Sequence, residues 1–357
     1  MNFAPPPMQT NLPPMAVNLY SDTQSKPSAA MKAAMMAAEV GDEQAGTDPT
    51  VTALCERMAA FLGKEAAVFM PSGTMCNQVA VLTHCRPGDE VLAHETAHII
   101  TSEGGGCAAL AGVQITGLKG AKGQFSLAAL QGAIRGRTRH TPPQTLLEVE
   151  QTANSGGGTV WSLDTLNALA EFAHSQGLAT HMDGARLTNA TVAAGIAPSD
   201  MVAGYDSVWL DFTKGLAAPL GAVLCGSSEF IGRAWRWKQR VGGAMRQGGI
   251  CAAACIYALD NNVARLAEDH ANARALARGL AQIPGITVEM PETNLVFFDT
   301  SGTGMDAHSL NMRARQHGVG FSVNQKYRGR ACTHFDVSAA DIETAIAVIR
   351  DVVATAA

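Results

Sequence analysis

The sequence predicts an α/β fold in which a large domain with a mainly parallel seven-stranded sheet precedes a small α+β domain. From about residue 30 to residue 226, short apolar segments of strand length alternate with helical segments. Such alternation is typical of βαβ units, which build parallel sheets. After about residue 254, a long helical stretch is followed by two strand-like segments and a closing amphipathic helix. This change of rhythm indicates a second domain.

The elements of the large domain can be placed to within a few residues. Strands are expected at 66–70, 90–93, 113–117, 144–149, 179–182, 207–210 and 222–225. Helices are expected at 49–62, 75–82, 127–136, 163–176 and 200–204.

The second domain is expected to begin at residue 255. Residues 252–280 are expected to form one long helix or two close ones. Residues 287–300 and 319–336 resemble strands, and residues 339–355 resemble a helix. A chain of 357 residues is longer than one core usually fills, so two domains are expected. We therefore predict a flexible proline-rich arm at 1–17, a large domain at 18–254 and a small domain at 255–357.

Composition excludes several classes of protein. The net charge is −5 and no basic stripe is present, so nucleic acid is not an expected partner. No apolar run approaches the roughly 20 residues that cross a bilayer, and the N-terminus lacks the pattern of a signal peptide. The eight cysteines form no C-x-x-C pair, which argues against a zinc or redox motif. We expect a cytoplasmic protein without a metal site or a membrane partner.

The segment Pro71-Ser72-Gly73-Thr74 follows an expected strand and opens an expected helix. A turn of small residues at a helix N-terminus presents free backbone N–H groups to an anion, and the hydroxyls of Ser72 and Thr74 can add hydrogen bonds to a phosphate. The alternative interpretation is an ordinary helix N-cap. The spacing fits neither a P-loop nor a dinucleotide-binding motif.

Two further segments lie at the ends of neighbouring strands. His181-Met182-Asp183-Gly184-Ala185-Arg186 ends one strand, where ligands of open α/β sheets bind. The Asp183 carboxylate can hold a protonated heterocycle, and Arg186 can bind a carboxylate with its planar fork. Alternatively, Asp183 and Arg186 pair with each other at a helix start.

The segment Asp211-Phe212-Thr213-Lys214-Gly215-Leu216 ends the next strand. Apolar neighbours lower the pKa of an amine and make it nucleophilic, which suits Schiff-base chemistry at Lys214. Most lysines are merely solvated, so the motif alone leaves both interpretations open. A phosphate turn, an aspartate after one strand and a lysine after the next together predict a pyridoxal 5'-phosphate site, in which the cofactor serves as an electron sink.

With these motifs, the chain resembles the threonine aldolase family of the fold-type-I superfamily of pyridoxal-phosphate enzymes. The resemblance extends from about residue 18 to residue 338. It rests on six motifs: Ser21-Asp22-Thr23; Gly41-Asp42-Glu43 with Asp48-Pro49-Thr50-Val51; Pro71-Ser72-Gly73-Thr74; Asp183-Gly184-Ala185-Arg186; Lys214-Gly215-Leu216; and Gly242-Gly243-Ala244-Met245-Arg246-Gln247.

The resemblance implies a role for each candidate residue. Lys214 would be the Schiff-base lysine, Asp183 the partner of the pyridine nitrogen, and Gly73 and Thr74 phosphate ligands. His98 would stack on the cofactor ring and can also move protons. The substrate carboxylate would be bound by Ser21, Arg186 and Arg330.

The chain departs from the family pattern at four positions. Ala45 replaces a common tyrosine, Ala153 a histidine that lies near the substrate hydroxyl, and Tyr20 an arginine. The loss of the histidine leaves His98 or a water as the base, and suggests room for a bulkier substituent.

The fourth departure concerns the cofactor phosphate. Gln239 stands where a lysine commonly reaches the phosphate of a neighbouring subunit, which leaves Lys238 or Arg240 to compensate. The resemblance implies a homotetramer, or at least a dimer, with its sites at subunit interfaces.

The expected reaction is retro-aldol cleavage of L-β-hydroxy-α-amino acids, such as threonine or allo-threonine, to glycine and an aldehyde. Two alternatives remain. A β-eliminating lyase would use the same cofactor site, because a fold does not fix a function. A cofactor-binding protein without catalysis is the third possibility, and the presence of Lys214, Asp183, His98 and both arginines argues against it.

Overall fold

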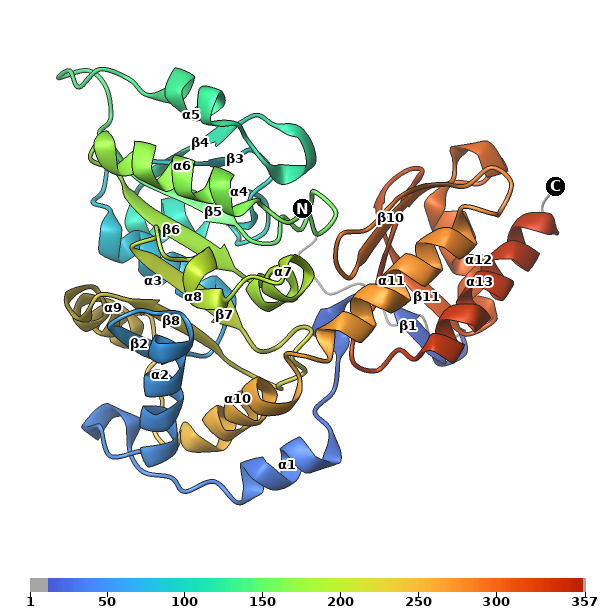
Figure 1. Cartoon of the computed structure of the whole chain (residues 1–357), viewed down its shortest axis with the longest axis horizontal. Helices are drawn as coiled ribbons and strands as arrows, with labels where there is room; N and C mark the ends of the chain where they lie inside the picture. Colours follow the sequence, from blue (N-terminus) through green and yellow to red (C-terminus); the bar gives the residue numbers. More distant parts are fainter. Residues whose placement is uncertain (1–11, 356–357) are drawn as a thin grey trace.

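The computed structural model describes residues 12–355 and confirms the α/β fold with a largely parallel seven-stranded sheet. Figure 1 shows this sheet in the larger part of the molecule. Its strands, in spatial order, are β2 (Ala66–Met70), β8 (Ala222–Gly226), β7 (Ser207–Asp211), β6 (Ala179–Gly184), β5 (Gln144–Glu150), β3 (Glu90–His94) and β4 (Gln114–Leu118). Only β8 runs against its neighbours β2 and β7. The sequence predicts all seven strands, each to within two residues.

Helices cover both faces of this sheet, and alternating strand residues enter two different cores. Val208 and Leu210 belong to a core with the helices α2, α6 and α10, whereas Trp209 between them packs with α3 and α9. The helices of this part are α1 (Ala29–Met36), α2 (Pro49–Phe61), α3 (Gly73–His84), α4 (His98–Thr101), α5 (Leu127–Ala133), α6 (Leu163–Ser175), α7 (Leu187–Ala194), α8 (Pro198–Met201), α9 (Ser228–Arg240) and α10 (Gly249–Asn261).

Helices begin at side chains that satisfy their free backbone N–H groups. Ser72 accepts a hydrogen bond from Met75 N at the start of α3 (3.3 Å), and Ser162 accepts one from Thr165 N at the start of α6 (3.2 Å). Expected helix 200–204 is instead α8, which starts earlier because Pro198 suits the first turn of a helix.

A second sheet of five strands lies beside the first (Figure 1). Its order is β1 (Val17–Leu19), β11 (Val319–Gln325), β12 (Arg328–Cys332), β10 (Leu295–Asp299) and β9 (Thr287–Glu289). The helices α11 (Leu266–Leu280), α12 (Ala307–Gln316) and α13 (Ala339–Ala354) share a separate core with it. The expected strand 287–300 is divided into β9 and β10, with Pro291, which has no N–H to donate, between them. The expected strand 319–336 is the hairpin of β11 and β12.

Two elements of the structure lie on the other side of the domain boundary that was expected after residue 254. The segment β1, near the beginning of the chain, pairs in parallel with β11 and so joins the second sheet. The expected run 252–280 is two helices, and Cys255 and Ala258 of α10 lie in the core of the first sheet. We therefore propose that the small domain begins near α11 and includes β1. Residues 1–11 of the expected proline-rich arm lie outside the described residues.

The direction of the strands determines where functional side chains meet. The strands β2, β3, β5, β6 and β7 run the same way, so their carboxyl ends lie along one edge of the sheet. The second sheet lies beside the large sheet and can contribute side chains to the same space (Figure 1). Across residues 12–355, no helix has the length and apolar character required to traverse a bilayer.

A buried ion pair fixes the segment that contains the glycine-rich motif at 242–247. Lys238 of α9 pairs with Glu43, and both side chains are almost fully buried. The second carboxylate oxygen of Glu43 accepts a hydrogen bond from Met245 N (2.7 Å). Burial lowers the pKa of Lys238, and Glu43 opposes that effect.

We predict that Glu43→Ala strongly destabilises the protein, because it leaves the Lys238 ammonium buried without its partner. The expected loss in free energy of unfolding is about 3–5 kcal/mol. Urea denaturation followed by circular dichroism measures it. The control Glu229→Ala removes an exposed carboxylate from α9, the helix that contains Lys238, and should have little effect. Equal midpoints for both variants would contradict the prediction.

Candidate functional site

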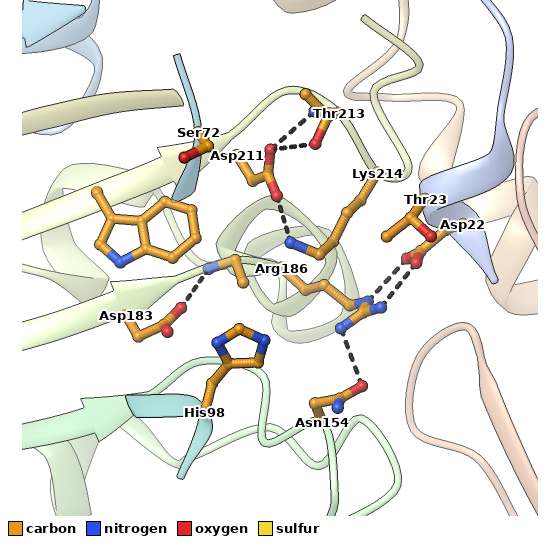
Figure 2. A network of polar contacts seen from close by, with 12 residues as sticks. Asp22, Thr23, Ser72, His98, Asn154, Asp183, Arg186, Asp211, Thr213 and Lys214 are labelled. Carbon is orange, nitrogen blue, oxygen red and sulfur yellow. Dashed lines mark hydrogen bonds and ion pairs between the residues drawn. The ribbon is translucent and has the colours of Figure 1, made fainter. Parts of the chain in front are cut away.

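A cavity of about 340 Å³ lies at the carboxyl edge of the large sheet, facing the second sheet. Nine of the ten residues that the sequence marked as a site line it: Ser21, Ser72, Gly73, Thr74, His98, Asp183, Arg186, Lys214 and Arg330. Figure 2 shows several of these side chains pointing into the same space from different elements. The tenth residue, Arg240, is not among the lining residues.

Asp183 lies at the end of β6 and is fully buried. Its Oδ2 accepts a hydrogen bond from the Asn77 amide (2.7 Å), and its Oδ1 accepts one from Ala185 N (2.9 Å). Burial raises the pKa of Asp183, and the bond from Asn77 and the nearby His98 oppose that rise. A buried carboxylate of this kind binds a cationic N–H group strongly, because little solvent competes for it.

Lys214 reaches the cavity from the turn after β7. Its Nζ forms an ion pair with Asp211 and lies 5.8 Å from the centroid of the Trp209 ring. Asp211 Oδ1 in turn accepts hydrogen bonds from the backbone and the hydroxyl of Thr213 (both 2.8 Å). These contacts hold the amine on the opposite side of the cavity from Asp183 (Figure 2).

The N-terminus of α3 forms another wall. Ser72 caps the helix, and Gly73 and Thr74 follow in its first turn. Gly73 has no space for a side chain: a Cβ atom there would lie 2.3 Å from the Trp209 ring. The glycine thus lets the helix end and the indole approach each other beside the cavity.

Arg186 pairs with Asp22 rather than with Asp183, so the two residues of this motif do not pair with each other. Its Nε and Nη2 donate to the two oxygens of Asp22 (2.7 Å each), and Nη1 donates to Asn154 Oδ1 (3.2 Å). Burial opposes ionisation of Asp22, yet the Arg186 guanidinium holds its pKa well below the ordinary value. Of the five N–H bonds of a guanidinium, these contacts use three, so each terminal nitrogen keeps one.

Arg330 enters from β12 of the second sheet, opposite Phe297 in the register. Within residues 12–355, its guanidinium has no carboxylate partner, and its buried Nε lacks a hydrogen-bond acceptor. Burial and the positive charge of Arg186 both lower the pKa of Arg330. Two guanidinium groups at one cavity, of which only Arg186 has a carboxylate partner among the described residues, favour an anionic ligand.

Lys238 and Arg240, the two residues expected to compensate for the missing phosphate lysine, lie in different environments. Lys238 is buried in its pair with Glu43 and does not line the cavity. Arg240 is exposed and stacks on the Trp237 ring, 4.6 Å from its centroid. Neither side chain reaches the cavity of its own chain.

Ala153 does not enlarge the cavity. It is buried and absent from the lining residues, and a Cβ atom at Gly123 would lie 2.6 Å from the Ala153 Cβ. The neighbouring Asn154 lines the cavity instead. This placement does not support the expectation that Ala153 makes room for a bulkier substituent.

Sequence reasoning missed several polar residues of the site. Glu150, Asn154 and Asp211 line the cavity, and their positions at strand ends could have indicated them. Burial and the nearby Asp183 raise the pKa of Glu150 to about 7. Asn77 and Glu103 lie beneath the cavity, and no local pattern distinguishes them from other helix or loop residues.

Comparison with known proteins agrees with this fold. Residues 18–303 match the model of the family described as Beta-eliminating lyase. The chain is 41% identical over 323 residues to the low specificity L-threonine aldolase of Escherichia coli K12, covering 90% of this chain and 95% of that protein. It is 37% identical over 347 residues to low-specificity L-threonine aldolase 1 of Arabidopsis thaliana, covering 95% and 97%.

The fold is also that of a solved relative. The Leishmania major threonine aldolase structure superposes with a TM-score of 0.81 at 20% identity, covering 94% of this chain and 99% of that one. The chain therefore belongs to the β-eliminating lyase family and, within it, to the threonine aldolases.

We predict that Gly73→Ala displaces the Trp209 ring and destabilises the protein by about 1–3 kcal/mol, the usual cost of overpacking. Thermal unfolding and tryptophan fluorescence measure the two effects. The matched control is Gly132→Ala on α5, where a Cβ atom meets nothing within 4 Å. That control should be neutral or stabilising, since alanine favours helix. A Gly73→Ala protein as stable as the control would contradict the prediction.

Proposed function

We propose that this protein is a pyridoxal-phosphate-dependent aldolase that cleaves L-β-hydroxy-α-amino acids to glycine and an aldehyde. The observation that supports this most directly is the arrangement of one cavity. A lysine amine and a buried carboxylate lie on opposite sides of it, the Arg186 guanidinium lies at a third side (Figure 2), and Arg330 also lines it. The threonine aldolases named above support the same substrate class.

The residues present fit the cofactor. The buried Asp183 carboxylate, held by two N–H donors, suits a protonated ring nitrogen. The start of α3 at Ser72, Gly73 and Thr74 offers backbone N–H groups and hydroxyls to a phosphate. Lys214 and His98 line the same cavity, where the Lys214 amine would bind the aldehyde carbon of the cofactor. When bound, the cofactor accepts the electron pair that is released at the substrate Cα.

The substrate carboxylate is assigned to the guanidinium groups. Arg186 keeps one N–H on each terminal nitrogen after its contacts with Asp22 and Asn154. Arg330 and the Ser21 hydroxyl complete this side of the cavity. Binding by two fixed groups orients the Cα–Cβ bond and turns cleavage into a positioned unimolecular step.

His98 is the group best placed to move the proton of the β-hydroxyl. Its side chain is 38% exposed and lines the cavity, and an imidazole exchanges protons near neutral pH. His98 Nε2 takes the hydroxyl proton while the Cα–Cβ bond breaks, and the hydroxyl-bearing carbon becomes the aldehyde. A proton then returns to Cα and glycine leaves.

We infer a homotetramer, or at least a dimer, in the cytoplasm. The exposed position of Arg240, outside the cavity of its own chain, is compatible with a phosphate contact across a subunit interface. β-Elimination on a related amino acid is the second candidate, supported by the description of the matching family. It would release ammonia and a keto acid instead of an aldehyde.

We predict that the purified, cofactor-loaded protein releases aldehyde from L-threonine, L-allo-threonine and L-phenylserine. Lys214→Ala should abolish release, because the amine that holds the cofactor is lost. A coupled alcohol dehydrogenase assay measures acetaldehyde, and absorbance measures benzaldehyde. Bound cofactor without aldehyde, together with ammonia release, would overturn the aldolase and favour elimination.

We predict that Arg330→Gln raises KM for threonine at least about 10-fold, because a charged hydrogen bond contributes about 1.5–3 kcal/mol. Initial rates over a range of substrate concentrations measure it. Arg328→Gln is the matched control, since Arg328 lies on the same strand and pairs with Glu289 outside the cavity. An unchanged KM in Arg330→Gln would remove this residue from the substrate site.

A further inference from the structure

Beneath the cavity lies a buried polar group that the mechanism above does not use. Its centre is Glu103, whose side chain is fully buried. Glu103 Oε1 is 2.8 Å from His98 Nδ1 and accepts a second hydrogen bond from the Asn77 amide (2.7 Å). The same amide nitrogen donates to Asp183 Oδ2 (2.7 Å). One asparagine thus connects the carboxylate beside the histidine to the carboxylate at the end of β6.

The orientation of the Asn77 amide follows from its other neighbours. Trp209 Nε1, which can only donate, lies 2.6 Å from Asn77 Oδ1. His181 Nε2 lies 3.2 Å from the same oxygen, and burial lowers the pKa of His181 to about 3, so this ring is neutral. The amide oxygen therefore faces the indole, and the NH₂ group faces the two carboxylates.

The orientation of the Asn77 amide also bears on whether the carboxylates and His98 form a metal site or a hydrogen-bonded cluster. Ligand atoms of His98, Glu103 and Asp183 lie within 4.8 Å of one another, a spacing that could hold a metal ion. Both N–H bonds of Asn77 point at the oxygens of this group, so a cation among them would meet positive hydrogen atoms. Hydrogen bonding explains the cluster better than a metal does.

The contact with Glu103 determines which edge of the imidazole meets the cavity. The His98 Nδ1 edge faces the fully buried carboxylate, and His98 N donates to Glu150 Oε2 (2.9 Å), which fixes the backbone. The opposite edge of the ring, with Nε2, is left to the cavity that His98 lines (Figure 2). In the part of the chain that the structure describes, Nε2 has no hydrogen-bond partner.

We propose that Glu103 is a positioning residue for the aldolase reaction: it keeps a proton on His98 Nδ1 and presents Nε2 to the substrate hydroxyl as the proton acceptor. Asn77 ties Glu103 to Asp183, so that the histidine and the carboxylate for the cofactor nitrogen keep a fixed relation. This inference rests on the proposed function, because Glu103 acts through the histidine that accepts the proton in that reaction.

The charges around His98 give the proposal a signature in pH. The hydrogen bond that His98 Nδ1 donates to Glu103 raises the pKa of His98, burial opposes it, and Asp183 and Glu150 add to the rise. Lys214 lies across the cavity. His98 accepts a proton only when it is neutral, so activity rises with pH through this pKa. Replacing Glu103 by a neutral group lowers the pKa of His98 and moves that rise to lower pH.

The first experiment examines His98 without relying on activity. Nitrogen-15 NMR of histidine-labelled cofactor-free protein reports which ring nitrogen is protonated, with His98→Asn to assign the signal. We expect the Nδ1–H form at high pH, the less common tautomer of free histidine. In Glu103→Gln the pKa of His98 should fall. The control Glu148→Gln alters a buried carboxyl on β5 whose pKa is raised by burial and which forms no hydrogen bond to His98 within the described residues, and it should leave His98 unchanged.

The second experiment is a double-mutant cycle with the cofactor-loaded enzyme. Glu103→Gln should lower the maximal kcat/KM by about 100-fold, the lower end of what general acid–base catalysis contributes, and shift the acid limb to lower pH. In a His98→Asn background the same change should have almost no further effect, because Glu103 acts through the histidine.

Each outcome has one meaning. The Nδ1–H tautomer, a lowered pKa in Glu103→Gln and non-additive rates support the proposal. An Nε2–H tautomer in the native protein, an unchanged pKa in Glu103→Gln, or additive losses would overturn it. If Glu103→Gln does not fold, the tautomer of the native protein still decides. Failure of the proposed function itself would appear separately, as native enzyme that releases no aldehyde.

Discussion

The carboxylate of Asp183 is buried at the end of a central strand, and much of the surrounding structure compensates for the cost of placing it there. An isolated charge in such a position is strongly destabilising, so buried carboxylates require hydrogen bonds or cationic partners. Asn77 and the backbone of Ala185 supply the hydrogen bonds. Asn77 is in turn oriented by Trp209 and His181, so α3 and the strands β6 and β7 are joined through one amide.

A buried charge pair joins the two sheets. Asp22 follows β1, which belongs to the second sheet, and Arg186 follows β6 of the first. Asn294, beside β10, adds a hydrogen bond to Asp22 (3.0 Å). Because both charges are buried, the relative position of the sheets is coupled to the geometry of the arginine. The guanidinium thereby has its orientation set in advance of ligand binding, which reduces the entropy lost on binding.

The charges of the cavity are arranged asymmetrically. Carboxyl groups of Glu103, Glu150 and Asp183 lie on the side of the histidine, whereas Arg186 and Arg330 lie toward the second sheet. An amino acid substrate carries one carboxylate, which the guanidinium side attracts. The acidic side raises the pKa of His98 and so tunes the group that exchanges the proton. The uneven distribution of charge in the cavity, in addition to direct hydrogen bonds, therefore distinguishes the carboxylate end of the substrate from the end that carries the hydroxyl.

The large sheet and most of the cavity could be predicted from local patterns in the amino-acid sequence. Each βα unit has a local signal, because an apolar strand, a turn and an amphipathic helix are consecutive in the chain. The carboxyl ends of parallel strands must then meet at one edge, and this rule alone predicts that Asp183 and Lys214 border the same space. The candidate phosphate turn at Gly73 follows from the same rule. Arg330 was predicted as a site residue through the resemblance to the family, because no local sequence pattern connects it with Arg186.

Contacts between residues distant in sequence, in contrast, became visible in the folded protein. The pairing of Arg186 with Asp22 spans 164 positions, and the contact of Asn77 with Asp183 spans 106. The burial of Lys238 against Glu43 removed it as a phosphate ligand, although its neighbours in sequence made it a candidate. The pairing of β1 with the second sheet also had no local signal, since three residues show no periodicity. Side-chain partners of this kind depend on packing in three dimensions, and local sequence does not encode them.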